Sequence, residues 1–366
     1  MNRENFPFGL SRQAVLCCTP FILVSVVAFL FGVFWEPQRI WANLLVVSFY
    51  LFGLGLGGAL FLALLSVTGA RWSSSIQPIL VKMTALLPAG AMGIALVVFA
   101  RPSLYPWAGN DPTGSTFQAF WLSRPLFLFR TLLYLIVLWT MSSLLVRATR
   151  HEEIGGKKVG LSGAFLVVFS LICWLASTDW IMSLEPSWSS TVFGVYIFSG
   201  MFLGTLAAVV LLARILSNKL TKDQWRDLGT LLFAFSSFWM YIWFSQYMLI
   251  WYVNNPEEAE YFVLRQQGPW QGLFLANLVL NWGVPFVVLL FRRAKENPAI
   301  LMTVAATVLF GRFLDIYLLV MPSVTRGQSM FGLWDVCLIP GTVALIALLV
   351  RRKQIPNFNW PEMQDS

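Results

Sequence analysis

The sequence predicts an all-α protein that crosses a membrane about ten times. Of its 366 residues, 58% are hydrophobic and only 11% are charged, and apolar runs of about twenty residues recur along the chain. An ordinary soluble domain carries about 25% charged residues, whereas a run of about twenty apolar residues spans the hydrocarbon core of a bilayer. The runs lack the two-residue alternation of a membrane β-barrel, so helices are expected.

Ten spans follow one another along the chain. They are expected at residues 13–34, 43–67, 78–100, 125–146, 160–180, 190–214, 228–252, 270–291, 298–320 and 331–350. No small-residue cleavage site follows the first run, so it is expected to be a retained helix. Most loops are short, and residues 1–366 are therefore predicted to form a single integral membrane domain.

The positive residues support this count. Most of the 25 Lys and Arg residues fall in alternate loops, beginning with the N-terminal segment. Because cytoplasmic loops are enriched in Lys and Arg, this alternation predicts that both termini lie in the cytoplasm. The same bias explains the net charge of +8, so nucleic-acid binding is not expected.

Cysteine and histidine usage argues against a cofactor held by this chain. The four cysteines form no C-x-x-C pair, and the single histidine, His151, lies in a charged loop. Zinc sites, iron–sulfur clusters and haem normally need such ligands. We therefore expect no metal site and no haem in this polypeptide.

Ionisable residues within spans are the first candidates for function, because charges at membrane depth are costly and tend to face a bundle interior or a water path. The candidates are Arg130, Asp179, Arg312, Asp315 and Asp335. Arg312 and Asp315 are three residues apart and can meet on one helix face. They form either a structural ion pair that offsets its own burial cost, or a proton relay or polar lining for a quinone head group.

Two further groups are candidates. Ser237, Tyr241 and Ser245 fall on one face of the seventh predicted helix, where hydroxyl groups either mediate helix packing or pass protons along. The segment at 178–188 joins the two halves of the chain and carries Glu185 as well as Asp179. We expect it on the face away from the cytoplasm, with both acids at the outer mouth of a proton path. Its two tryptophans, Trp180 and Trp188, are either interfacial anchors or contacts for a quinone.

Two segments resemble a known family. Residues 177–196 read STDWIMSLEPSWSSTVFGVY and residues 246–258 read QYMLIWYVNNPEE. Both resemble the F-type integral membrane subunit of bacterial alternative complex III, a quinol:electron-acceptor oxidoreductase, and the likeness extends over most of the chain in helix count, loop lengths and order. More distantly, residues 188–200 resemble the NrfD/PsrC family of quinone-interacting membrane subunits.

The resemblance implies an arrangement of two four-helix bundles. Helices two to five (43–180) would form the first bundle and helices six to nine (190–320) the second, with helices one and ten outside them. It also implies a place in the bacterial cytoplasmic (inner) membrane, in a complex that oxidises menaquinol or ubiquinol. The implied partners are a C-type quinol-binding membrane subunit, an iron–sulfur subunit and haem c subunits, with a terminal oxidase as a further candidate. The F-type subunit would bear no cofactor, and would scaffold the complex and take part in proton translocation.

Two other functions remain open from the sequence. The chain fits a quinone-binding NrfD/PsrC-like anchor of another oxidoreductase, with the head group near Asp179, Trp180 and Trp188. It also fits a secondary transporter, which would need helices broken at equivalent positions of two related halves. Helix-breaking residues such as Pro88 and Pro285 do occur within spans, but they do not pair between the halves.

Overall fold

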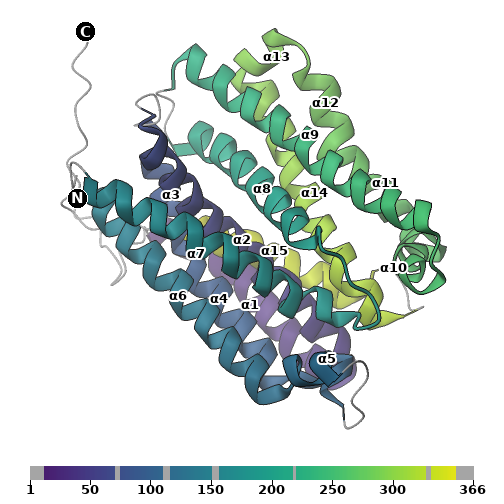
Figure 1. Ribbon diagram of the computed structural model, residues 1–366. Helices are drawn as coiled ribbons and strands as arrows, with labels where there is room; N and C mark the ends of the chain where they lie inside the picture. Colours follow the sequence, from purple (N-terminus) through teal and green to yellow (C-terminus); the bar gives the residue numbers. More distant parts are fainter. Residues whose placement is uncertain are drawn as a thin grey trace.

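The computed structural model describes residues 12–70, 75–109, 116–150, 156–216, 220–326 and 331–351. This part of the chain is helical and contains no strand, and ten of its helical spans are long and apolar enough to cross a membrane (Figure 1). The predicted all-α polytopic membrane fold is therefore confirmed. His151, the single histidine, lies outside the described residues.

Eight spans are single helices, and two are composite. The single helices are α1 (Arg12–Trp35), α2 (Pro37–Thr68), α6 (Arg124–Arg150), α7 (Gly156–Trp180), α8 (Phe193–Leu216), α9 (Lys222–Val253), α14 (Pro298–Thr325) and α15 (Leu333–Arg351). The third span joins α3 (Gln77–Met83) to α4 (Leu87–Ala100) through a 3₁₀ turn, and the eighth joins α11 (Gln271–Leu278) to α12 (Val284–Leu289) through a π-helical turn (Val279–Gly283). Short helices connect the spans: α5 (Thr116–Trp121), α10 (Pro256–Gln266) and α13 (Arg292–Glu296).

Proline accounts for two of the polar contacts between helices. A proline inside a helix lacks the N–H that would bond the carbonyl four residues earlier. Pro285 thus frees the carbonyl of Asn281, which accepts a hydrogen bond of 2.6 Å from the Ser236 hydroxyl of α9. Pro322 likewise frees the carbonyl of Leu318, and a side chain of α10 supplies the missing donor, as described below.

Helix α2 lies at the centre of the molecule. It packs against α4, α6 and α7 of the first half of the chain and also against α8 and α14 of the second half. In the second half, α8 packs on α9 and α14, and α14 also contacts α11 and α12. Helices α1 and α15 pack chiefly on one another, beside α2. We call α2, α3–α4, α6 and α7 the first set of helices and α8, α9, α11–α12 and α14 the second set, by their order in the chain. The central helix α2 contacts members of both sets.

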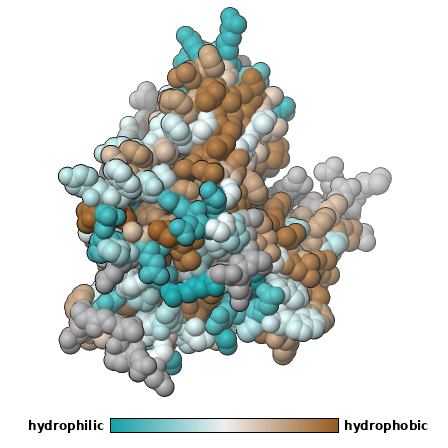
Figure 2. All heavy atoms as spheres, turned by 90° about the vertical axis from the view of Figure 1, so that its right-hand side faces the viewer, coloured by the Kyte–Doolittle hydropathy of each residue, from teal (hydrophilic) through white to brown (hydrophobic). Residues whose placement is uncertain are grey.

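The surface fits a lipid environment. Large apolar side chains on α1, α7 and α9 are exposed, among them Phe34, Leu171 and Leu249. Figure 2 shows a broad band of hydrophobic side chains along the upper part of one face, with hydrophilic groups at its top and in its lower half. Because successive spans alternate in direction, α5, α10 and the α7–α8 connection (181–192) lie at the same end of the molecule, which we call the connection end.

Candidate functional site: buried ion pairs in the helix bundles

Asp179 at the end of α7 is held by side chains from α5 and α6. Arg130 donates from Nε to Oδ2 at 2.8 Å and from Nη2 to Oδ1 at 3.0 Å. The Trp121 indole and the Tyr134 hydroxyl donate to the same carboxylate at 3.0 and 3.1 Å. The guanidinium also lies over the Trp121 ring, 4.1 Å from its centroid. Asp179 is completely buried, so the expected open mouth at this residue is not present; the carboxylate is the centre of a closed network.

Asp315 on α14 is the centre of a second network. Arg312 donates from Nη2 to Oδ2 at 2.7 Å, as the spacing of three residues predicted. The Tyr196 hydroxyl of α8 and the Asn277 amide of α11 donate to Oδ1, the latter at 2.7 Å. The Asn281 amide donates to Asn277 Oδ1, also at 2.7 Å. The Ser236 hydroxyl of α9 donates in turn to the backbone carbonyl of Asn281. A chain of hydrogen-bonded polar groups therefore runs from Asp315 through α11 and the π-helical turn to α9.

Sequence reasoning missed Tyr196, Asn277, Asn281 and Ser236 of this network. All four are buried. Asn277 and Asn281 are four residues apart in an otherwise apolar span, which places them on one helix face. That spacing was a usable signal, because an amide buried in a membrane span needs a partner. Helix α8 offered no such signal, since a tyrosine near a span end is equally typical of an interfacial anchor.

Asp335 at the start of α15 forms the third buried pair. Arg39 at the start of α2 donates from Nε to Oδ2 at 3.0 Å, and the Asn43 amide donates to Oδ1. The backbone N–H of Gly332 also donates to this carboxylate. The pair ties the outlying helix α15 to the central helix α2, so its position indicates a structural attachment.

Glu185 lies apart from these networks, in the α7–α8 connection. Its Oε1 accepts from Arg326 at 2.7 Å, while its Oε2 is buried and has no hydrogen-bond partner among the described residues. It lines a hollow of about 90 Å³ with Trp188 and Tyr261, whose rings are stacked 3.8 Å apart. The exposed guanidinium of Arg326 makes this a surface pair, unlike the three pairs inside the bundles.

The two tryptophans of the connection occupy different places. Trp180 is buried against α2, with edge-to-face contacts to Phe49 and Phe52, and its indole donates to Thr131 at 3.2 Å. Trp188 lies in the Glu185 hollow on the Tyr261 ring. The structure therefore does not bring the two predicted quinone contacts together.

The predicted hydroxyl stripe of α9 does not form a continuous interior path. Tyr241 is 64% exposed and points away from the bundle. The Ser237 hydroxyl is buried but has no hydrogen-bond partner among the described residues, and Ser245 is only partly buried. Ser236, one position earlier, faces the interior instead. A shift of one residue turns a side chain by about 100° around a helix, so Ser236 reaches the carbonyl of Asn281 whereas the three predicted hydroxyl groups do not share one environment.

Arg265 anchors α10 to α14 at the break made by Pro322. Its guanidinium donates to the carbonyls of Leu318 and Leu319 at 2.9 and 3.0 Å and to the Ser323 hydroxyl at 2.9 Å. It also lies 3.5 Å from the centroid of the Tyr261 ring. Burial lowers the pKa of Arg265 from its ordinary value, although a guanidinium stays charged at any physiological pH.

The fold and these networks define a polytopic helical membrane protein with three buried guanidinium–carboxylate pairs in its described part. No group of three or more His, Cys, Asp or Glu side chains that could hold a metal ion occurs among the described residues. Comparison with protein-family models found no match, and comparison with curated proteins found none.

Proposed function

We propose that this chain is a membrane subunit of a quinol-oxidising respiratory complex of the alternative complex III type. It would lie in the bacterial cytoplasmic membrane with both termini on the cytoplasmic side. Its partners would be a C-type quinol-binding membrane subunit, an iron–sulfur subunit and haem c subunits. The likeness of residues 177–196 and 246–258 to the F-type subunit supports this proposal.

The observation that carries a role in proton transfer is the Asp315 network. Asp315 is 1% exposed, within a helix of 28 residues that is long enough to span a membrane. Ionisable residues inside membranes mark proton or ion pathways by default. In the proposed role, protons would pass between the Asp315 carboxylate and the Tyr196 hydroxyl, which donates directly to it. The amides of Asn277 and Asn281 continue the polar contacts toward α9.

The Arg130–Asp179 pair supports a scaffolding role. It joins α6 to α7, and the same guanidinium reaches the carbonyl of Trp121 in α5 at 2.8 Å. The pair thus sets the geometry of the connection end, where the α7–α8 segment meets α5. In the proposed complex this end faces the iron–sulfur and haem c subunits.

The transporter alternative receives no support from the helix irregularities. The 3₁₀ turn interrupts the second helix of the first set of four, whereas the π-helical turn interrupts the third helix of the second set. A transporter with two related halves places its broken helices at equivalent positions.

Gentle extraction tests the proposed function. The tagged chain is purified from its membranes in mild detergent, and the eluate is examined by its haem spectrum and for quinol:cytochrome c activity. Co-purifying covalent haem c together with quinol oxidation is the expected result. A colourless, solitary protein without such activity would overturn the proposal.

A further inference from the structure

The Glu185 hollow lies where two connections between spans meet. Its lining comes from the α7–α8 connection with Glu185 and Trp188, from α10 with Glu260 and Tyr261, and from Arg326, which follows the end of α14. Figure 1 shows α10 and the α7–α8 connection at the same end of the molecule. The hollow is therefore assembled from three parts of the chain that are distant in sequence.

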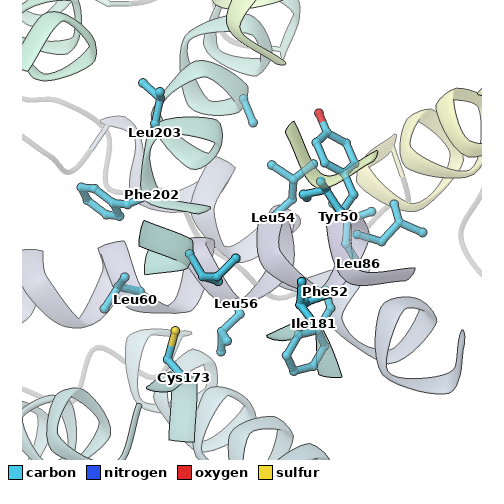
Figure 3. Close-up of a cluster of buried hydrophobic side chains, with 14 of the residues drawn as sticks. Tyr50, Phe52, Leu54, Leu56, Leu60, Leu86, Cys173, Ile181, Phe202 and Leu203 are labelled. Carbon is cyan, nitrogen blue, oxygen red and sulfur yellow. The ribbon is translucent and has the colours of Figure 1, made fainter. Parts of the chain in front are cut away.

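The walls of the hollow are held by packing on both sides. At the start of the connection, Ile181 belongs to the buried apolar cluster that also contains Phe52 of α2 (Figure 3). The neighbouring Trp180 ring lies edge-on to Phe52, with the ring centroids 5.7 Å apart. Further along, the stacked rings of Trp188 and Tyr261 join the connection to α10. The hollow is therefore formed before any ligand enters it.

A buried carboxylate oxygen at the hollow lacks a partner. Glu185 is only 9% exposed, and its Oε2 has no hydrogen-bond partner among the described residues. Its other oxygen accepts from Arg326, and both members of this ion pair line the hollow, so the carboxylate forms part of the wall. A charged acceptor that is buried without a partner is costly. The site therefore calls for a ligand that brings a hydrogen-bond donor.

The charges at the hollow select a cation that lies close to an anion. Glu185 and Glu260 supply two carboxylates, against the single guanidinium of Arg326. A primary ammonium has three N–H donors and no acceptor, so it matches the free oxygen of Glu185. The Arg326 side chain is 63% exposed beyond its contact with Glu185, and a guanidinium is a strong partner for a phosphate. The lining thus suits a molecule that joins an ammonium to a phosphate.

The volume of the hollow limits the group that carries the ammonium. A cavity of about 150 Å³ holds benzene, which is about 25 Å³ for each of its six heavy atoms. The hollow of about 90 Å³ therefore has room for an aminoethyl group, whose three heavy atoms need about 75 Å³ on the same scale. The six heavy atoms of a trimethylammonioethyl group do not fit. The hollow thus favours ethanolamine over choline.

The hollow lies at the level of lipid head groups. Trp251 and Tyr252 end α9 just before α10, and both are exposed. Exposed Trp and Tyr residues at the ends of spans lie at the membrane–water interface, level with the head groups. Helix α10 continues from this point and turns Tyr261 and Phe262 into the protein. A membrane phospholipid therefore meets the hollow with its head group.

We propose that the Glu185 hollow binds the head group of phosphatidylethanolamine. The ammonium enters the hollow and donates to Glu185 Oε2, with Glu260 as a second carboxylate in the same wall. The phosphate stays at the opening and accepts from the exposed guanidinium of Arg326. This site needs only the present chain and a membrane, so it does not rest on the proposed function.

A lipid series on the wild type tests the site. The full-length chain is purified in detergent, freed of lipid and titrated in native mass spectrometry with dioleoylphosphatidylethanolamine, its N-methyl and N,N-dimethyl derivatives, and dioleoylphosphatidylcholine. Each added methyl group removes one N–H donor and adds one heavy atom, while the acyl chains stay the same. We expect the affinity to fall about tenfold from the first lipid to the last, which corresponds to about 1.4 kcal/mol. Equal affinity along the series would overturn the proposal.

Two matched substitutions locate the preference. Glu185→Gln removes the charge that faces the ammonium, whereas Glu258→Gln makes the same change on α10 outside the lining of the hollow. The first should abolish the preference for phosphatidylethanolamine over phosphatidylcholine, and the second should retain it. A Glu185→Gln variant that keeps the preference would overturn the proposal. The wild-type series decides the question even if this variant does not fold.

A lysine of another protein is the alternative source of an ammonium. If a lysine occupies the hollow instead, the chain alone shows no preference along the lipid series, and the lipid assignment is overturned. All binding is measured on the chain alone, so the result does not depend on which subunits co-purify with it.

Discussion

Arg312 of α14 lies directly against Gly200 of α8. A Cβ built on Gly200 would lie 2.0 Å from Nη2 and 2.4 Å from Cζ of the guanidinium. The guanidinium therefore fits against α8 at this position only because residue 200 has no side chain beyond a hydrogen atom. The guanidinium is also tied to Asp315, which prevents it from moving aside. This contact joins the ion pair of α14 to the packing of α8.

Gly200→Ala should therefore destabilise the protein strongly. The methyl group displaces the guanidinium and separates a buried ion pair, and breaking such a pair costs about 3–5 kcal/mol. The midpoint of thermal unfolding in detergent measures the effect. Gly204→Ala is the control, because its Cβ would lie 3.5 Å from Arg312 Cγ, an ordinary contact. Equal midpoints for the two variants would contradict this account of the contact.

Asp179→Leu should destabilise the first set of helices by a similar amount. It leaves Arg130 buried without its carboxylate, and an unpaired buried charge costs about 3–5 kcal/mol. The double variant Arg130→Met with Asp179→Leu should recover much of the loss, because an apolar pair can replace a buried ion pair. Unfolding midpoints of the single and double variants provide the test. A double variant no more stable than Asp179→Leu would show that the hydrogen bonds from Trp121 and Tyr134, rather than the charge, dominate.

Arg265→Lys should loosen α10 from α14. A lysine ammonium cannot reproduce the planar fork that reaches two carbonyls and the Ser323 hydroxyl together. The loss should amount to about 1–3 kcal/mol, because a carbonyl freed by Pro322 is left unsatisfied. Hydrogen exchange of α10 measures the loosening directly. Arg326→Lys offers a control, since that guanidinium is largely exposed and its replacement should leave exchange in α10 unchanged.

The Glu296 contacts predict an acid-dependent loss of stability at the end opposite the connection end. Hydrogen bonds from Arg292 and Lys222 hold the pKa of the Glu296 carboxyl below its ordinary value of 4.5. A lowered pKa means that the folded state favours the charged form, so this contribution is complete above pH 4.5 and is lost as the pH falls through the folded pKa. Unfolding midpoints of the wild type and Glu296→Gln should differ at pH 7, and the difference should shrink as the pH falls below 4.5. A difference that stays constant from pH 7 through the acid range would argue against the linkage.

Asp315→Asn should uncouple proton release from quinol oxidation if the chain serves the proposed complex. The amide keeps the shape of the carboxylate but cannot exchange a proton at this position. Proton release per quinol oxidised, measured with the complex in sealed vesicles, should fall while the subunits still co-purify. Tyr241→Phe is the control, because that hydroxyl points away from the bundle. Normal proton release in Asp315→Asn would contradict the assigned role of Asp315.

The comparison of α9 and α14 shows where sequence reasoning succeeded and failed. On α14 the partners Arg312 and Asp315 share a helix, so helical periodicity alone paired them. On α9 the same periodicity placed three hydroxyl groups on one face, but it could not say which hydroxyl bonds a neighbouring helix, and that one belongs to Ser236 rather than Ser237. Arg130 and Asp179 were each chosen for membrane depth, yet their pairing needed the packing of α6 on α7.

The sequence by itself determined the class of fold, the number of spans and the residues whose charge is costly inside a membrane. Those properties depend on local composition and on the length of apolar runs, because a span must match the thickness of the bilayer and pair its own backbone groups. Only the tertiary structure decided that Tyr196 and Asn277 complete the Asp315 network and that Arg39 pairs with Asp335. These features require side chains from helices distant in the chain to meet at one depth and one rotation. Such contacts depend on how whole helices pack against one another, and a local sequence pattern does not determine that packing.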